Sequence, residues 1–582
     1  MGTFKSAVIT KKGQALMAKV VSGATKLTFT KIAVSEANLG SDLASLTGIG
    51  TIKQSQPVAS VVRQNETYVK VGASFSNDKL STGYYVRNIG LYATDPQEGE
   101  ILYSVSVADE SSKTADWMPP FNGIGSSSLI VDLVTAVSNA SNVTVSVDPS
   151  AMATVAQINT LKSEVDDVKS FVGYEEADVY GVEVDFANRR VTRIAGNENL
   201  SAGADFDNLK PWQRKRCNLA DDGTVNAYRG DSGYKEDGSN GMVMVEQPIF
   251  YVKTVPIKTK PATSGKGVEV VKARYYISPT PKVGFKAPEV FKDEHGILQD
   301  KIYLSAFEGS IYDTSASAFL LNDEQVADFA GDKLCSIAGA KPASGLTQNL
   351  TRGNVRKLCN NRGAGWRAHD ILALSVTQWL ILIEYASMNT QNTIGRGVCD
   401  LTDDGKSNMA YATGATSSLG NGSGNAEGGV NGKCSVSYRG EENLWGNIWT
   451  WLDGINILAK GLNDAYIRQI GQAMADDTTT GYENFGTHLS HSNGYQSAMG
   501  YSEEYPELFL PTACAGSDSS PTNGDQYWQN KDYSGFLIAR LGCRWDGGSY
   551  CGAWCLRVGD ASSGRDRHIG GRLLYVPQTK VA

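Results

Sequence analysis

The C-terminal part of the chain carries side chains that are suited to binding a partner molecule. From Leu541 to Tyr575 the residues Arg, Trp, Tyr, Asp and Gly recur, whereas Asn, Lys, Glu, Gln and Met are absent, although Asn is frequent earlier in the chain. Tyr, Trp and Arg provide a large contact area and directional hydrogen bonds, and Gly leaves room for a partner. The composition of this segment therefore predicts a recognition surface.

Enzymatic cleavage of a polysaccharide would need two carboxylates that face a groove. Asp400, Asp403 and Asp404 lie close together in the sequence, and so do Glu503 and Glu504. Acidic pairs on loops are usually only solvated, and no parallel β-helix repeat is visible. A polysaccharide-degrading enzyme (depolymerase) is therefore kept as the alternative function.

Metal chemistry has little support from the residue spacing. His488 and His491 stand i,i+3 in a Ser/Asn/Gly context, which is more often a polar loop than a metal site. The segment that begins at Asp400 is similar to a calcium loop but lacks its bidentate Glu. The nine Cys form no CxxC pair, and Cys551 to Cys555 is a CxxxC without a second half. We assign no metal and no cofactor, and we expect buried free thiols.

The bulk composition predicts a multidomain, β-rich protein. The 582 residues are too many for one hydrophobic core, and 62 Gly with only 17 Pro indicate β-structure and long ordered loops. The net charge is −8 and no basic stripe appears, so we expect no nucleic-acid partner. No apolar core of a signal peptide is present, and the apolar stretch 371–383 is interrupted by Gln378. We therefore expect synthesis in the cytoplasm and no membrane insertion.

Changes of hydrophobic period divide the chain into four parts. Residues 1–150 read as β-rich, with a helix between Gly13 and Gly23 and strands at 27–34, 129–134 and 143–147. Residues 151–174 show a two-heptad seam, which fits either a short coiled-coil connector or one amphipathic helix. Residues 175–300 form a β-rich intermediate region, and 301–582 a C-terminal domain. That domain contains a helix over 375–388 and a large loop over 400–432.

The N-terminal part resembles a known family of structural domains. The segment AVITKKGQAL (7–16) precedes LTFTKIAV (27–34), and IGLYA (89–93) and GEILY (99–103) follow in that order. This order looks like the N-terminal domain of phage tail-collar fibre proteins. The resemblance implies a domain that attaches the chain to baseplate or other tail proteins.

The C-terminal 280 or so residues resemble a second family. The GNIWTW segment (446–451) is similar to formylglycine-generating-enzyme-like domains, a branch of the C-type lectin fold. The stretch from 540–545 through 569–574 resembles the closing strands of that fold. It looks closer still to the variable proteins of diversity-generating retroelements. The resemblance implies a C-type lectin-like domain with a variable region at about 540–575.

The same resemblance implies which residues bind a ligand and which support them. The implied variable, ligand-binding positions are Arg544, Asp546, Gly547, Tyr550, Cys555, Arg557, Gly559, Asp560, Gly564, Asp566 and His568. Adenine-directed mutagenesis of Asn codons reaches all of these residue types, and Cys555 would fit a diversified Tyr codon. The implied framework positions are Trp545, Trp554, Ser562, Ser563, Arg565, Arg567 and Arg572. Arg565 and Arg567 fit structural ion pairs equally well.

Relatives of the formylglycine-generating type suggest an oxidase as a further alternative. That chemistry needs two closely placed Cys that bind copper, and the candidates Cys543, Cys551 and Cys555 lie at or beside variable positions. We therefore expect no enzymatic activity.

Together these observations predict a mainly β protein with an α+β C-terminal domain. The expected function is that of a phage tail-fibre receptor-binding protein, a homotrimeric adhesin at the fibre tip of the virion tail. Its partners would be tail or baseplate proteins and a bacterial surface protein or glycan. A purely structural fibre is the remaining interpretation.

Overall fold

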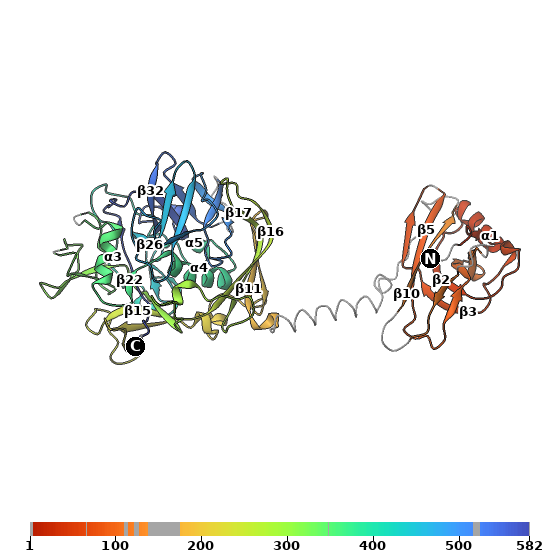
Figure 1. Cartoon of the computed structure of the whole chain (residues 1–582), viewed down its shortest axis with the longest axis horizontal. Helices are drawn as coiled ribbons and strands as arrows, with labels where there is room; N and C mark the ends of the chain where they lie inside the picture. Colours follow the sequence, from red (N-terminus) through yellow and green to blue (C-terminus); the bar gives the residue numbers. More distant parts are fainter. Residues whose placement is uncertain are drawn as a thin grey trace. The chain divides into compact units, whose positions relative to one another are not determined.

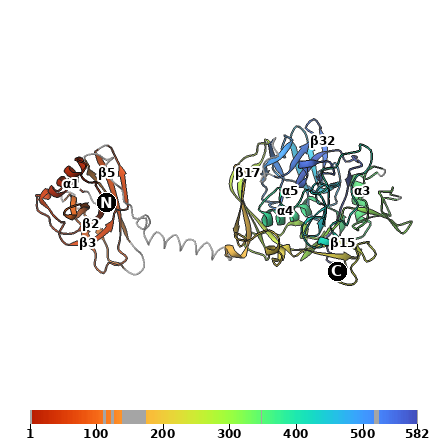
Figure 2. The same ribbon diagram turned by 180° about the vertical axis from the view of Figure 1, so that it is seen from behind.

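A computed structural model describes residues 4–65, 67–109, 115–121, 127–137, 175–326, 328–346, 349–515 and 524–580. They belong to two compact units, Met1–Phe171 and Val172–Ala582, each of which is considered by itself (Figures 1 and 2). Strands predominate over helices in both units, which confirms the prediction of a mainly β protein. The expected strand at 143–147 and the connector at 151–174 lie outside the described residues.

The first unit packs one helix against β-sheets. A five-stranded sheet has the order β1-β8-β7-β2-β3, a three-stranded sheet the order β10-β5-β4, and β6 pairs with β9. The bounds are β1 (Val8–Ile9), α1 (Lys11–Val21), β2 (Phe29–Ser35), β3 (Ile52–Pro57), β4 (Ser60–Arg63), β5 (Tyr68–Ser76), β6 (Tyr84–Val86), β7 (Asn88–Asp95), β8 (Gly99–Val107), β9 (Asp116–Met118) and β10 (Ser128–Ala136).

Helix α1 shows how local sequence and tertiary packing agree in this unit. The Thr10 hydroxyl caps the helix by accepting a hydrogen bond from the Gly13 backbone N–H at 3.0 Å. Leu16 and Val20, one turn apart, are buried against the sheets. A Cβ at Gly13 would lie 2.2 Å from the Tyr103 carbonyl oxygen, so only Gly lets the helix approach β8 this closely.

The second unit is built on two large sheets and two small ones. The largest has the order β12-β11-β17-β29-β31-β33-β32-β26-β27-β28, with β16 on β17, β30 on β29 and β34 on β26. Its bounds are β11 (Tyr180–Asp185), β12 (Arg190–Ala195), β16 (Tyr251–Pro261), β17 (Val268–Ser278), β26 (Trp449–Ala459), β27 (Asn463–Arg468), β28 (Tyr482–Asn484), β29 (Gly494–Gly500), β30 (Pro511–Ala515), β31 (Gln526–Gln529), β32 (Gly535–Gly542), β33 (Gly552–Asp560) and β34 (Ile569–Gly570).

The other sheets of this unit enclose the opposite side of the core. A six-stranded sheet has the order β14-β13-β15-β18-β35-β22, and two three-stranded sheets have the orders β20-β19-β21 and β23-β24-β25. Their bounds are β13 (Lys215–Leu219), β14 (Val225–Tyr228), β15 (Met242–Pro248), β18 (Lys301–Ser305), β19 (Ser310–Asp313), β20 (Ala318–Leu320), β21 (Lys333–Cys335), β22 (Trp366–Ala368), β23 (Gly424–Asn425), β24 (Val436–Tyr438), β25 (Glu441–Glu442) and β35 (Leu573–Tyr575). The helices are α3 (Arg352–Asn360), α4 (Ile371–Tyr385) and α5 (Thr390–Thr393).

The expected boundary at residue 300 does not separate two units. Strand β15 pairs with β18, and β18 pairs with β35 near the C-terminus. Strands β11, β12, β16 and β17 likewise join the sheet that contains β26 and β32. Residues 175–300 therefore share sheets and a hydrophobic core with the rest of the unit. This long-range pairing has no signal in the local hydrophobic period.

Helix α4 is the buried helix expected over 375–388, but it begins and ends earlier. The Asp370 carboxylate caps it by accepting from the Ala373 N–H at 2.8 Å, and Ala386 ends it with a φ of 48°. The interrupting polar residue Gln378 donates to the Ala553 carbonyl at 2.9 Å, and Glu384 pairs with Arg439 at 2.8 Å. Among the described residues, no helix has the length and apolar character needed to span a membrane.

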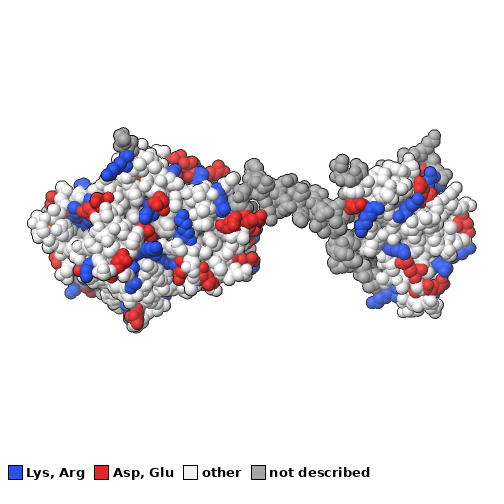
Figure 3. All heavy atoms as spheres, turned by 90° about the horizontal axis from the view of Figure 1, so that it is seen from below, with Lys and Arg blue, Asp and Glu red and all other residues white. Residues whose placement is uncertain are grey.

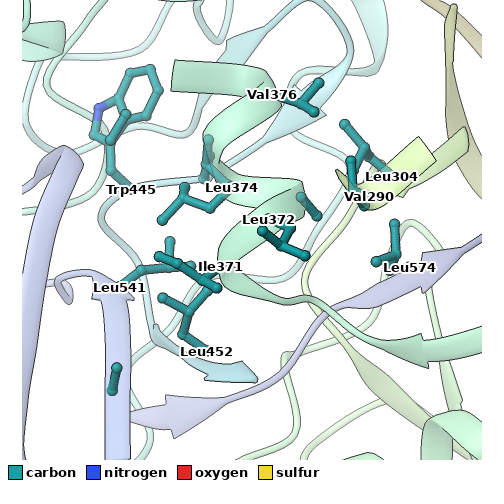
Figure 4. Close-up of a cluster of buried hydrophobic side chains, with 14 of the residues drawn as sticks. Val290, Leu304, Ile371, Leu372, Leu374, Val376, Trp445, Leu452, Leu541 and Leu574 are labelled. Atoms are coloured by element: carbon teal, nitrogen blue, oxygen red, sulfur yellow. The ribbon is translucent and has the colours of Figure 1, made fainter. Parts of the chain in front are cut away.

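The first turns of α4 support the strands that carry the C-terminal residues. Ile371 and Leu374 lie beside Leu452 of β26 and Leu541 of β32 in one buried cluster (Figure 4). On the outside of the unit, Lys/Arg and Asp/Glu side chains are interspersed on the face that Figure 3 shows. Asp400–Gly432 is mostly irregular, as predicted, apart from one short 3-10 helix and β23.

This packing predicts a measurable dependence of stability on Leu541. Leu541→Ala should lower the free energy of unfolding by about 2–5 kcal/mol, because it leaves a cavity between β32 and α4. Leu462→Ala, at a side chain that is 42% exposed, is the matched control and should change it by less than about 0.5 kcal/mol. Urea unfolding followed by Trp fluorescence measures both, since every Trp except Trp117 lies in the second unit. Equal losses in the two variants would contradict the assignment of Leu541 to the core.

Candidate functional site

Residues from five strands and two loops of the second unit surround a cavity of about 660 Å³. The strands are β26, β31, β32, β33 and β34, and the loops are the segments 543–551 and 561–568, of which the first contains a 3-10 turn at Gly548–Tyr550. We call this space the tail cavity. Its lining residues are Trp449, Gln526, Trp528, Arg540, Cys543, Arg544, Asp546, Gly547, Tyr550, Arg557, Asp560, Gly564, Arg565, Asp566, His568 and Ile569.

Strand alternation decides which side chains reach the tail cavity. Strand β33 pairs antiparallel with β32 and parallel with β31, so it is interior to the sheet. Successive side chains of a strand point to opposite faces. Leu556 and Val558 belong to the hydrophobic core, whereas Arg557 between them lines the cavity.

The structure brings nine of the eleven predicted ligand-binding residues together around this cavity. They are Arg544, Asp546, Gly547, Tyr550, Arg557, Asp560, Gly564, Asp566 and His568. Cys555 and Gly559 are not among the lining residues. Cys555 is 2% exposed, and Gly559 lies beneath the indole ring of Trp528, where a Cβ would come within 2.1 Å of a ring carbon.

Gly547 lines the cavity but has no space for a side chain. A Cβ there would lie 2.2 Å from the Cys543 Sγ and 2.8 Å from the Cys551 Sγ. Real Cβ atoms do not approach other atoms this closely, so a larger residue at 547 would displace both thiols. In contrast, Tyr550 projects a side chain that is 46% exposed and packs its ring beside Tyr495.

Charged side chains on the loops form a connected set at one end of the cavity. The Arg544 guanidinium donates to the Asp546 carboxylate at 2.6 and 3.1 Å and lies 2.9 Å from the His568 Nε2. Burial, followed by repulsion from Arg544 and Arg540, lowers the pKa of His568 to about 2. A neutral imidazole with its proton on Nδ1, 2.9 Å from Asp566, can accept from Arg544 through Nε2.

Two further arginines are held against indole rings. Arg540 lies over Trp449, with 5.0 Å between the guanidinium carbon and the ring centroid, and Arg557 lies over Trp528 at 3.7 Å. Both contacts are cation–π interactions. Burial lowers the pKa of Arg540 to about 10, which leaves it charged at neutral pH.

Besides Cys543, which the sequence suggested only as a copper ligand, five lining residues were missed by reasoning from the sequence: Trp449, Gln526, Trp528, Arg540 and Ile569. Trp449 lies within the GNIWTW segment, and Arg540 and Ile569 open two of the segments that carry the resemblance, so a signal existed for these three. Gln526 and Trp528 had none. They reach the cavity because β31 pairs with β33 in parallel, across a long sequence separation.

The predicted framework residues differ in burial. Trp545 and Trp554 are buried, Ser562 donates a hydrogen bond to Asp477, and Ser563 is exposed. Arg565 is exposed and donates to the Asn349 side chain at 2.9 Å, while also lining the cavity.

Arg567 joins the tail to the loop that begins at Asp400. Its guanidinium donates to the Asp403 carboxylate at 2.5 Å, and the Trp545 indole N–H donates to the same group at 3.2 Å. The hydrogen bond from Arg567 is the main reason that the pKa of Asp403 falls to about 2. Asp403 and Asp404, candidates for a catalytic pair, therefore stay ionised and bind Arg567.

Arg572 is a framework residue that the fold encloses completely. Its side chain is fully buried and donates to the Glu442 and Ser305 carbonyls, each at 2.8 Å. It thereby connects the C-terminal segment to β25 and β18, which are distant in sequence.

Three of the nine free thiols lie together beneath the cavity. Cys543, Cys551 and Cys555 are each less than 5% exposed, and Cys543 adopts a φ of 71°, rare for a residue with a Cβ. Burial raises the pKa of the Cys551 and Cys555 thiols well above the usual range, so they are protonated and poor nucleophiles. In the described part of the chain, no three His, Cys, Asp or Glu side chains are placed to hold a metal ion. His488, one of the His pair, lies 3.0 Å from Asp464.

Comparison with known families bears on the first unit. Residues 1–157 match the family described as "Phage tail-collar fibre protein, N-terminal". This match confirms the resemblance predicted from the IGLYA and GEILY segments, which form β7 and β8. It covers the first unit's described strands and helix and none of the tail cavity.

Two solved structures are similar to the chain, both variants of the Major Tropism Determinant. The P3c variant aligns with 66% of this chain and 77% of its own, at 12% identity and a TM-score of 0.21. The I1 variant aligns with 69% and 84%, at 13% identity and a TM-score of 0.21. Likenesses at these scores establish neither fold nor function. No curated protein matches the chain.

The contacts of Arg572 predict a large effect on stability. Arg572→Met should lower the free energy of unfolding by about 3 kcal/mol or more, because buried carbonyls lose a charged donor. Arg565→Met, at an exposed position on the same segment, should change it by less than about 0.5 kcal/mol. Thermal and urea unfolding of the two variants measure the difference. A tolerated Arg572→Met would show that this residue does not hold the tail in place.

The low pKa of His568 predicts a dependence of stability on pH. Below pH 6.5 the unfolded chain protonates this His while the folded chain does not, so stability falls as the pH is lowered. His568→Gln should therefore lose about 2 kcal/mol less stability than the wild type between pH 7 and pH 5. Burial raises the pKa of Glu308 to about 8 and of Glu507 to about 7, so these two groups make the folded state more stable as the pH is lowered. Their contribution is the same in the wild type and in His568→Gln and cancels in the comparison. Parallel curves of unfolding free energy against pH would contradict a neutral, buried His568.

Proposed function

We propose that the chain is a receptor-binding protein of a phage tail fibre and has no enzymatic activity. The first unit would attach it to tail or baseplate proteins, and the tail cavity would bind a molecule on the bacterial surface. The family match over residues 1–157 supports the attachment role and a place in the virion tail. We further propose a homotrimer, which would present several cavities and gain affinity through avidity.

One observation carries the binding role. Nine residues that the tail's resemblance implies as ligand-binding converge on a single cavity, although they come from two loops and a strand. Of these, Arg544, Tyr550 and Asp566 present side chains that solvent reaches. Aromatic and Arg side chains around a concave surface are typical of binding hot spots.

The finer part of the proposal concerns the variable region. We propose that the second unit is C-type lectin-like and that the residues of the tail cavity are diversified by a retroelement. The absence of Asn from 541–575 supports this origin, because adenine-directed changes remove Asn codons. Sequencing of the neighbouring genome tests it: a reverse-transcriptase gene beside a near-copy of the 3′ end, differing only at adenines, is the expected finding.

The carboxylates around the cavity favour binding over hydrolysis. Asp546 pairs with Arg544, Asp560 lies 3.3 Å from Arg540, and Asp566 lies beside His568. A glycosidase needs one carboxyl group that is protonated and free to donate to the scissile bond. Incubation of the protein with host capsule or wall, followed by chromatography of the supernatant, should release no fragments.

A point substitution at the exposed lining residue Tyr550 tests the binding role. Tyr550→Ala should weaken binding to host bacteria about tenfold or more, because the exposed ring is lost from the lining. Tyr411→Ala is the matched control: this side chain is 41% exposed and lies outside the lining. Flow cytometry of the fluorescently labelled full-length protein on host cells measures both. Unchanged binding by Tyr550→Ala, or an equal loss in both variants, would overturn the proposal.

A further inference from the structure

Two arginines stand directly opposite each other on the floor of the tail cavity. Arg540 of β32 and Arg557 of β33 are register partners in the antiparallel pair. Side chains of directly opposed residues lie within about 5.5 Å at Cβ, and like charges at such positions repel each other. The rings of Trp449 and Trp528 hold both guanidiniums in place, so neither swings away from the other freely.

The protein itself supplies only part of the compensating negative charge. Asp560 lies 3.3 Å from the Nε of Arg540, while no carboxylate of the described residues lies within 4 Å of the Arg557 guanidinium. In the described part of the chain, neither Arg540 nor Arg557 donates a side-chain hydrogen bond. The buried Nε of Arg557 has no partner there, and that of Arg540 has only the ion pair with Asp560. The Arg540 side chain is only 5% exposed, so water does not readily solvate it.

The remaining charges leave the cavity with a cationic floor. Asp546 accepts from two of the three guanidinium nitrogens of Arg544, and Asp566 lies beside His568. Repulsion from the surrounding arginines contributes to keeping His568 uncharged. An anion placed over β32 and β33 would therefore meet two cations, Arg540 and Arg557, and one carboxylate, that of Asp560. The Cys543 thiol, whose pKa is lowered by hydrogen bonds with Cys551 and Cys555, is the other acidic group beside the two arginines.

The dimensions favour a small ligand over a flat protein surface. A volume of about 660 Å³ lies within the usual range of about 300–1,000 Å³ for small-molecule sites and is concave. Arg guanidiniums bind carboxylate and phosphate through paired, charge-assisted hydrogen bonds. Hydroxyl-bearing ligands find further partners in Gln526, Tyr550 and Asp546 on the same lining.

We propose that the tail cavity binds an acidic sugar, with its carboxylate or phosphate group held between Arg540 and Arg557. This inference rests on the proposed function, of which it specifies the receptor chemistry as an acidic bacterial glycan. The anion would accept from the terminal N–H groups of the two guanidiniums, which donate no hydrogen bond within the described residues. The rim then contacts the sugar ring and its neighbours.

Three monosaccharides test the proposal directly. Isothermal titration of the full-length protein with D-glucuronate, D-glucose 6-phosphate and D-glucose compares a carboxylate, a phosphate and a neutral sugar of similar shape. At low salt, at least one of the two anions should bind tenfold or more tightly than glucose, and added NaCl should weaken that binding. The anion that binds more tightly shows whether the site prefers a carboxylate or a phosphate. Equal binding of all three sugars, or binding of none, would overturn the inference.

Matched variants locate the anion within the cavity. Arg557→Gln should lower the affinity for the preferred anion about tenfold or more, and Arg557→Lys should restore part of it. Arg190→Gln, at an exposed arginine of the edge strand β12, should bind as the wild type does. Circular dichroism and thermal unfolding verify that each variant is folded. Should Arg557→Gln not fold, Arg544→Gln should leave at least half of the anion selectivity, because Asp546 already occupies that guanidinium.

Cell binding separates this inference from the function on which it rests. Loss of binding with Tyr550→Ala but no preference for anions would retain the receptor-binding role and reject the acidic sugar. If the protein selects anions but neither Tyr550→Ala nor Arg557→Gln changes cell binding, the anion site would be retained and the receptor-binding role of the cavity rejected. Binding to cells that is abolished by protease and unaffected by D-glucuronate would indicate a protein receptor and overturn the inference.

Discussion

Arg540, Arg557 and Asp560 line the tail cavity because they lie on β32 and β33, two interior strands of the largest sheet. Strands β32 and β33 present one face to the core around α4 and the other to the cavity. Leu541 and Val558, on the core side, are completely buried, and the removal of such side chains costs several kcal/mol. Arg540 and Arg557, on the other side, do not fill this core. The two-residue period of a strand thus separates positions that maintain the fold from positions that contact a ligand.

Buried guanidiniums hold the loops around the cavity in place. A charged group inside a protein must be paired or fully hydrogen-bonded, so each such contact specifies one arrangement of the chain. Arg572 fixes the closing segment to β18 and β25, and Arg567 fixes it to the loop at Asp403. Arg352, on α3, is fully buried and joins that helix to Asp476 and to the backbone of β26. The rim of the cavity is therefore held by charge-assisted contacts across distant segments.

What the sequence predicted depended on how local each signal was. The helical spacing within 375–388 predicted α4, and alternation predicted β2 and β10, because those elements follow their own period. The resemblance of the tail to the variable proteins of diversity-generating retroelements implied nine of the sixteen residues that line the cavity. The sequence did not predict that Trp528 lines the tail cavity or that 175–300 shares its sheets with the rest of the second unit. Both features depend on pairing between strands that are distant in sequence. The contact among Cys543, Cys551 and Cys555 also follows from the tertiary fold and not from their spacing.

The arrangement restricts how far the proposed variable face can vary. Gly547 and Gly559 lie among predicted variable positions, yet a Cβ at either would meet a thiol or the Trp528 ring. Tyr550, in contrast, is almost half exposed, and other side chains fit at its position. Arg540 lies outside the predicted variable set and on the floor of the cavity. Diversification of the rim would then change which neighbouring groups of a ligand are recognised, while a constant cation below continues to require a negative charge.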